Sequence, residues 1–203
     1  MKLIVITGDC MVEDEAAVWN TLFERGMATL HLRKPSASEN DIRNLLLQTK
    51  PGFLDRIVLH DQFALIHSFP LKGVHLNRRN PVRPQEIQSS VSRSCHAVEE
   101  LEAIGDFNYV FLSPIFDSIS KSAYAQAFTA EELLYAQSRG LINEKVVALG
   151  GIDTTTIPLA AKYGFGGVAV LGALWGNYRQ DNDQKALIKR FDKLLATANK
   201  QGK

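Results

Sequence analysis

The chain has 203 residues, a length that fits one domain or a small eight-stranded barrel. Hydrophobic residues make up 45% and charged residues 22%, which is the balance of a globular protein and excludes a disordered one. The 23 Lys and Arg residues almost equal the 22 Asp and Glu residues, so no global basic field attracts nucleic acid or an anionic membrane. Any anion site must therefore be local.

The first apolar run, residues 1–6, ends at Thr7 and Asp9 and is too short for a signal peptide or a membrane span. It predicts a strand. Cys10 and Cys95 lack the spacing of a metal or redox pair, so we expect reduced thiols and a cytoplasmic protein.

Short apolar, β-branched runs recur along the chain and predict eight strands. They cover residues 3–7, 27–33, 56–61, 73–77, 92–96, 109–114, 145–151 and 167–174. Helical patterns fall at 12–25, 41–50 and 181–200. The alternation favours a single-domain (β/α)8 barrel over residues 1–203, because an open doubly wound sheet has fewer strands.

Two helix starts are predicted by capping boxes, in which a Ser or Thr hydroxyl precedes an Asp or Glu carboxylate by three residues. These pairs are Ser38 with Asp41 and Thr129 with Glu132. The connections 63–69 and 82–90 are too short for full helices, so we expect the barrel to be trimmed there.

Polar residues and glycines cluster at the predicted strand ends, where barrels gather their reactive groups. Because side chains alternate along a strand, His31 and Arg33 share one face, and Ser94 and His96 share a face opposite Cys95. Cys95 is therefore interpreted as a small buried hydrophobe.

Arg33, Lys34 and Lys121 supply cations near one mouth of the predicted barrel. Backbone amides at Gly150, Gly151 and residues 164–167 would join them. Such a set suits phosphate, which guanidinium binds bidentately. The polar stretch 117–124 follows the sixth predicted strand, and its length and composition are typical of a lid loop. Ser118 and Ser120 lie beside Lys121 in this stretch.

Taken together, these motifs resemble the thiamine-phosphate synthase and TenI family in nearly every strand and in order. The resemblance rests on His31-Leu32-Arg33, Asp61, Gly73-Val74-His75-Leu76, Ser94-Cys95-His96, Ser113-Pro114-Ile115-Phe116, Ser118-Ile119-Ser120-Lys121, Ala148-Leu149-Gly150-Gly151-Ile152 and Gly167-Val168-Ala169-Val170. It implies a synthase that joins hydroxymethylpyrimidine diphosphate to thiazole phosphate, giving thiamine phosphate and pyrophosphate, with Mg²⁺ bridging the pyrophosphate.

The resemblance also implies roles for single residues. Arg33, Ser94 and Lys121 would stabilise the departing pyrophosphate, and Asp61 would bind Mg²⁺; the alternative for Asp61 is an ion pair with Arg33. Gly151 and Gly172 would form the lip of the thiazole-phosphate pocket. The remaining candidates for binding substrate or phosphate are His31, Lys34, His60, His96, Ser118, Ser120 and Gly150.

Several positions depart from the family pattern. His31 replaces a glutamine, His60 an asparagine, Asn80 a second metal aspartate, Asn77-Arg78 a Gly-Gln pair and Gly172 a serine, while a lysine is displaced to Lys34 with Pro35 in its place. An amide at a carboxylate position weakens a Mg²⁺ site, because this hard cation prefers anionic oxygen.

Two alternatives to the synthase therefore stay open. One is a TenI-like tautomerase, for which His31 and His96 are candidate proton-transfer groups, although Pro114 favours the synthase. The other is a non-catalytic barrel that binds thiazole or thiamine phosphate. His67 is interpreted as a surface residue, and the sequence leaves a monomer and a homo-oligomer both open.

Overall fold

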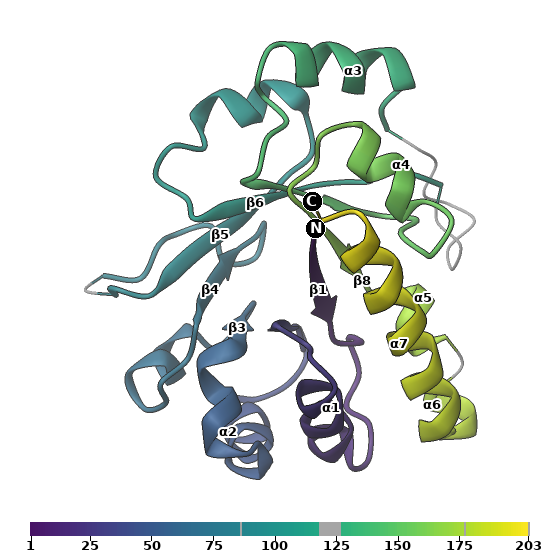
Figure 1. Cartoon of the computed structure of the whole chain (residues 1–203). Coiled ribbons are helices and arrows are strands. Elements are labelled where there is room, and N and C mark those ends of the chain that lie inside the picture. The colour runs from purple at the N-terminus through teal and green to yellow at the C-terminus, as the bar shows by residue number, and fades with distance from the viewer. Residues whose placement is uncertain (86, 118–126, 177, 203) are drawn as a thin grey trace.

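The eight predicted strands are present and form a closed parallel barrel in sequential order, β1 to β8 (Figure 1). The computed structural model describes residues 1–85, 87–117, 127–176 and 178–202. The strands are β1 Lys2–Ile6, β2 Thr29–Leu32, β3 Ile57–Leu59, β4 Gly73–Leu76, β5 Ser90–Cys95, β6 Tyr109–Leu112, β7 Val146–Leu149 and β8 Gly167–Val170. The prediction of a (β/α)8 barrel is confirmed.

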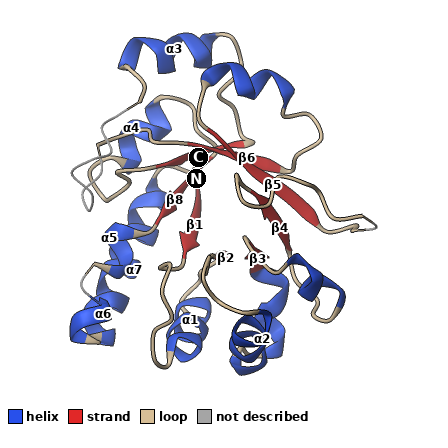
Figure 2. Cartoon of the chain, turned by 180° about the vertical axis from the view of Figure 1, so that it is seen from behind, coloured by secondary structure: helices blue, strands red, loops and turns tan. Residues whose placement is uncertain are grey.

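Helices surround the barrel, as Figures 1 and 2 show from opposite sides. They are α1 Glu15–Glu24, α2 Glu39–Gln48, α3 Ala130–Ser138, α4 Ile157–Lys162, α5 Gly172–Trp175, α6 Tyr178–Asp181 and α7 Gln184–Lys200. Short 3-10 helices lie at η1 Pro51–Arg56, η2 Phe63–His67 and η3 Val98–Ala103. Among the described residues, no helix is long and apolar enough to cross a membrane.

Local sequence signals explain where several helices begin. The Ser38 hydroxyl accepts from the Asp41 amide, and Thr129 does the same for Glu132, so both predicted capping boxes are confirmed. The last helix begins three residues later than predicted, after Asn182 with its left-handed φ of 49° and an Asp183 cap. Its final turn receives the N-terminal ammonium, which donates to the Ala198 carbonyl at 3.0 Å.

The trimmed connections are also confirmed. Only the 3-10 helix η2 joins β3 to β4, and the described residues between β4 and β5 contain no helix. His67, at the end of η2, is exposed as predicted. The outward side chains of β4 and β5, Val74, Leu76 and Val91, instead form a small apolar cluster of their own.

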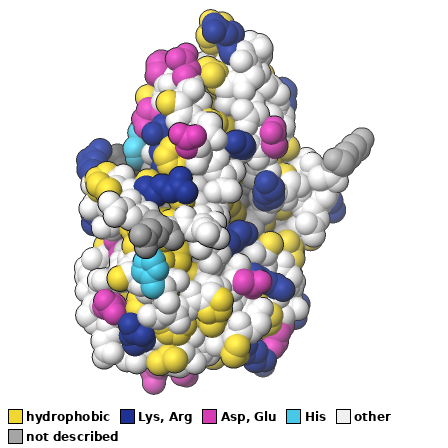
Figure 3. All heavy atoms as spheres, turned by 90° about the vertical axis from the view of Figure 1, so that its left-hand side faces the viewer, with side chains coloured by type: hydrophobic (Ala, Val, Ile, Leu, Met, Phe, Trp, Pro, Cys, Tyr) yellow, Lys and Arg dark blue, Asp and Glu magenta, His cyan; other side chains and the backbone are white. Residues whose placement is uncertain are grey.

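The main apolar core lies between the strands and the helices, where Leu30, Leu32 and Cys95 are buried, and the interpretation of Cys95 as a buried hydrophobe is confirmed. On the surface, Lys and Arg side chains are interspersed with carboxylates on the face seen in Figure 3, as the near-zero net charge of +1 predicts.

Candidate active site at the barrel mouth

The barrel interior is divided into an apolar half and a polar half. Side chains from β1, β6, β7 and β8 form an apolar cluster of Ile4, Ile6, Phe111, Val147 and Ala169. The strands β2 to β5 instead turn polar groups inward. Since alternate residues share a face, the inward positions of β2 are Thr29 and His31, as predicted.

Three histidines meet in the polar half, and we call His31, His60 and His75 the histidine cluster. His31 Nδ1 lies 2.8 Å from His60 Nε2. The rings of His60 and His75 stack with their centroids 4.3 Å apart. The register aligns Leu59 with Val74, so His60 and His75 follow as neighbours on adjacent strands.

Hydroxyl groups surround the histidine cluster. His31 Nε2 lies 2.6 Å from the Tyr109 hydroxyl. Both nitrogens of His75 lie 2.9 Å from serine hydroxyls, Nδ1 from Ser92 and Nε2 from Ser94. His75 therefore fixes the side chain of Ser94, a predicted pyrophosphate partner.

Burial keeps the histidine cluster uncharged. Desolvation lowers the pKa of His31 and of His60 well below the ordinary value, and it lowers the pKa of His75 to about 3. The expectation that His31 and His60 bind phosphate is corrected, because both imidazoles are buried beneath the mouth and contact each other. Sequence reasoning missed His75 as a site residue, although it is inward-facing on a strand with Gly73.

The low pKa of His75 predicts an acid-sensitive fold. Between pH 6.5 and about 3 the unfolded chain binds a proton that the folded His75 does not, so stability falls as pH falls. One such histidine costs about 1.4 kcal/mol of unfolding free energy per pH unit. Urea unfolding at pH 7 and pH 5 should therefore show a shallower pH slope for His75→Gln than for the wild type.

The exposed His67 is the matched control, and His67→Gln should keep the slope of the wild type. Coinciding slopes for His75→Gln and the wild type would contradict a neutral buried imidazole.

Arg33 stands at the mouth as a half-buried cation. The Thr7 hydroxyl holds its backbone, accepting from the Arg33 amide at 2.9 Å and donating to the Arg33 carbonyl at 3.1 Å. Within the described ranges, its guanidinium forms no ion pair. The charge is close enough to His60 to help lower the pKa of that imidazole. Arg33 is thus available for an anion.

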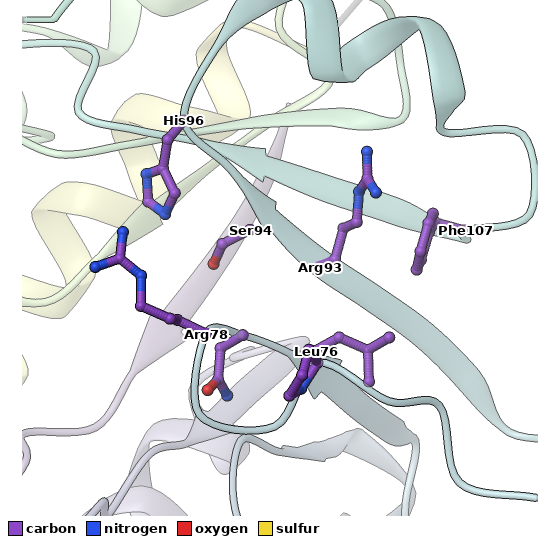
Figure 4. A pocket seen from close by; sticks show the side chains of 8 residues that line it. Leu76, Arg78, Arg93, Ser94, His96 and Phe107 are labelled. Atoms are coloured by element: carbon purple, nitrogen blue, oxygen red, sulfur yellow. The ribbon is translucent and has the colours of Figure 1, made fainter.

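A cavity of about 290 Å³ opens beside β5 and the end of β4. Its lining includes Ser94, His96 and Arg78, and Figure 4 shows the Arg78 guanidinium and the His96 ring on one side of β5, next to Ser94. Arg93 and Phe107 lie farther along the same strand region. Sequence reasoning noted Arg78 only as a departure from the family pattern, and its place directly after strand four was the signal that could have identified it.

His96 is held at the rim by backbone contacts. Its Nδ1 lies 3.0 Å from the Ser113 carbonyl oxygen, and its amide donates to Glu100 Oε1 at 2.9 Å. The imidazole is exposed, unlike those of the histidine cluster. His96 therefore remains a candidate for contact with substrate.

Asp61 forms no ion pair with Arg33, so the alternative to Mg²⁺ binding given for Asp61 is wrong. Its Oδ1 accepts from Arg79 Nη2 and from Asn80 Nδ2, each at 3.0 Å. The carboxylate side chain is 12% exposed and that of Arg79 is 43% exposed. Asn80 is thus in contact with Asp61, while the predicted role of Asp61 as a Mg²⁺ ligand stays a prediction.

Lys34 is corrected as a phosphate ligand. Its ammonium is buried and ion-paired with Glu15, at 2.6 Å from Oε2, and it also donates to the Cys10 carbonyl at 2.5 Å. Burial raises the pKa of the Glu15 carboxyl, and the Lys34 charge opposes that shift. Because both charges are enclosed, Lys34 is a structural residue beneath the loop that follows β1.

The predicted glycine amides divide between the two ends of the barrel. Gly150 and Gly151 follow β7 with left-handed φ values of 97° and 62°, and a Cβ at Gly151 would lie 2.4 Å from the Asp117 carbonyl oxygen. Gly172 begins the short helix α5 after β8. Residues 164–166 instead precede β8 and Gly167 begins it, while the Gly166 amide donates to the Val146 carbonyl at 3.0 Å, so their expected role at the mouth is wrong.

Lys121, Ser118 and Ser120 lie outside the described residues. Their predicted roles in a lid over departing pyrophosphate remain predictions.

The fold and the mouth together define a class: (β/α)8 barrels whose C-terminal end presents arginine, histidine and serine side chains at a cavity. A family model described as thiamine monophosphate synthase, TMP-TENI, matches residues 2–174. The chain belongs to this family.

Several relatives support the assignment. The chain is similar to a thiamine-phosphate synthase of Levilactobacillus brevis, with 30% identity over 147 residues, 67% of this chain and 66% of that protein. A thiamine-phosphate synthase of Listeria innocua is 28% identical over 66% of this chain and 64% of its own length. The chain thus matches just under two thirds of the length of these curated relatives.

A solved structure covers the whole fold. Thiamine phosphate pyrophosphorylase from Bacteroides thetaiotaomicron is 40% identical and superposes with a TM-score of 0.90, covering 98% of both chains. The thiamine phosphate pyrophosphorylase from Pyrococcus furiosus has a TM-score of 0.70 at 20% identity, which supports the fold alone.

Proposed function

We propose that the protein is a thiamine-phosphate synthase, a transferase of thiamine biosynthesis. The observation that carries the proposal is Arg33 at the mouth of a barrel of this family, close to His60 and without an ion pair to any of the described residues. The curated relatives at 28–30% identity are named thiamine-phosphate synthases and the solved structure at 40% identity is named a thiamine phosphate pyrophosphorylase, which favours this reaction over a tautomerase or a non-catalytic binder.

In the proposed reaction, the carbon–oxygen bond between the hydroxymethylpyrimidine group and its diphosphate breaks, and a carbon–nitrogen bond to the thiazole forms. Pyrophosphate leaves with the electron pair of the broken bond. The task of the protein is to orient the two substrates and to stabilise the negative charge that develops on the leaving group. Arg33, Ser94 and Lys121 are the proposed pyrophosphate partners, and Arg78 joins them from the cavity beside β5.

The thiazole phosphate is proposed to bind at the loops after β7 and β8. Gly150 and Gly151 let the loop after β7 pack closely against Pro114 and Asp117 of the loop after β6, and Gly172 begins the short helix α5 that follows β8. Phosphate sites in (β/α)8 barrels are frequently built from the same two loops and the start of a short extra helix. The two phosphorylated groups would then face one another across the mouth.

Magnesium fits this site as an ion held mainly by substrate oxygens. Asp61 offers one carboxylate, and Mg²⁺ is commonly bound by one or two carboxylates together with substrate phosphates. When bound, the ion would neutralise charge on the leaving pyrophosphate. Arg79 already contacts the Asp61 carboxylate, so this guanidinium competes with the metal for the same oxygen.

The competition predicts a change in magnesium dependence. Arg79→Gln should lower the magnesium concentration for half-maximal rate by up to about fivefold, because a partly exposed ion pair is worth about 0.2–1 kcal/mol. Asp61→Asn should raise it, and Asn80→Asp should lower it by adding an anionic ligand. Initial rates over a magnesium titration measure all three.

Arg83→Gln is the matched control, since Arg83 is an exposed arginine on the same connection. An unchanged magnesium dependence in both Arg79→Gln and Asp61→Asn would make Asp61–Arg79 a structural ion pair.

The synthase is tested by offering both substrates with Mg²⁺ and following thiamine phosphate and pyrophosphate. Equal amounts of the two products are expected. A second assay supplies only the non-aromatic thiazole tautomer. Conversion there, without product in the first assay, would replace the synthase by the tautomerase. We place the synthase reaction in the cytoplasm as part of the same proposal.

A further inference from the structure

We propose that the histidine cluster, His31, His60 and His75, is a binding site for a borderline-soft divalent metal ion such as Zn²⁺ or Co²⁺. This site is distinct from the proposed magnesium position at Asp61. Each histidine offers one ring nitrogen, and the three nitrogens lie within 4.8 Å of one another.

Binding requires a rearrangement of side chains, because the three nitrogens lie up to 4.8 Å apart and the stacked rings of His60 and His75 must turn before both nitrogens face one ion. Nitrogens that share a tetrahedral zinc ion lie about 2.0–2.1 Å from it and so roughly 3.4 Å from one another. The closest pair, His31 Nδ1 and His60 Nε2, is 2.8 Å apart and shares one proton in the metal-free state. An ion that replaces this proton would move the two rings apart by roughly half an ångström.

The chemical state of the imidazoles also fits. Metal binding requires neutral imidazole, and burial lowers the pKa of all three histidines. Imidazole nitrogens suit Zn²⁺, Co²⁺, Ni²⁺ and Cu²⁺, whereas Mg²⁺ prefers oxygen. The site would therefore discriminate against the cation proposed for the pyrophosphate.

The surroundings orient the ligands as they do in known metal sites. With Nδ1 on the metal, His31 keeps Nε2 free to donate to the Tyr109 hydroxyl, 2.6 Å away. Burial raises the pKa of Tyr109, so the phenol stays protonated. Whichever nitrogen of His75 binds the ion, the other keeps a serine hydroxyl at 2.9 Å. Such hydrogen bonds fix the tautomer and the ring orientation of a ligand.

Three histidines leave a fourth tetrahedral position for water or a small anion. The His75–Ser94 contact joins the histidine cluster to the candidate active site, so an ion bound through His75 Nδ1 would have a ligand that also contacts the proposed pyrophosphate partner Ser94. The ion would thereby stabilise the arrangement of the mouth from inside the barrel.

The test measures metal content, and its outcome does not depend on synthase activity. Untagged protein is produced with added Zn²⁺, or refolded from denaturant with Co²⁺, and then dialysed against a weak chelator. We expect about one ion per chain by elemental analysis, and visible absorption typical of tetrahedral Co²⁺. His31→Gln and His60→Asn should each retain less than about a tenth of the metal under the same dialysis, because each removes a ligand while keeping a polar side chain.

His67→Gln controls for adventitious binding by histidine, because His67 is exposed and outside the histidine cluster. Circular dichroism of each variant establishes that it is folded. Wild-type protein without stoichiometric Zn²⁺ or Co²⁺ after both routes would overturn the proposal. So would a folded His31→Gln, His60→Asn double variant that retains as much metal as the wild type.

Discussion

Arg33→Ala is expected to lower turnover by about two to three orders of magnitude, the loss typical of removing one preorganised group that stabilises developing charge. The reason is that Arg33 forms no ion pair in the described part of the chain, while its backbone is fixed to Thr7 at the barrel mouth. Its charge therefore remains available for the leaving pyrophosphate. Turnover with both substrates at saturation is the measurement.

Two further variants separate charge from geometry. Arg33→Lys keeps the charge but loses the planar pair of donors, so we expect an intermediate rate. Arg43→Ala removes a guanidinium that is partly exposed on α2 and paired with Glu39, and it should leave the rate unchanged. A loss of less than about threefold in Arg33→Ala, under about 0.7 kcal/mol of barrier, would remove Arg33 from the proposed machinery.

Glu15→Ala is expected to destabilise the protein by about 3–5 kcal/mol, because it leaves the Lys34 ammonium buried without its carboxylate. The side chains of Lys34 and Glu15 are 0% and 1% exposed, so water cannot replace the missing partner. The Cys10 carbonyl remains as an acceptor, yet it carries no full charge. Urea unfolding at neutral pH measures the loss.

The double variant Glu15→Leu, Lys34→Met is the decisive comparison. Replacing both charges by apolar groups of similar volume is often neutral or stabilising, so much of the lost stability should return. If Glu15→Ala unfolds at the same urea concentration as the wild type, the enclosed ion pair does not stabilise the fold. If the double variant is as unstable as Glu15→Ala, packing rather than unpaired charge accounts for the loss.

Much of the fold could be predicted because its signals are local. Apolar runs and helix caps depend on residues a few positions apart, so the eight strands and the caps at Ser38 and Thr129 followed from the sequence. Alternation along β2 and β5 also predicted the inward faces that carry His31 and Ser94.

The candidate site could be predicted only in part. Arg33 was recognised because it ends an alternating strand, and it does stand at the mouth as a half-buried cation. The misplacement of residues 164–167 was avoidable, because they lie at the start of β8. The N-terminal ends of the parallel strands lie at one end of a barrel, and the C-terminal ends, where active sites form, lie at the other. Arg78 was missed because it follows its strand by two residues in an irregular connection.

The sequence by itself determined the barrel, its trimmed connections and the family, since these depend on periodicity, caps and the order of motifs. Only the tertiary structure decided which charges remain available. It enclosed Lys34 with Glu15, joined Asp61 to Arg79 and brought three histidines from neighbouring strands together. The physical reason is that ion pairing and desolvation depend on distance in space and on burial, which sequence separation does not specify.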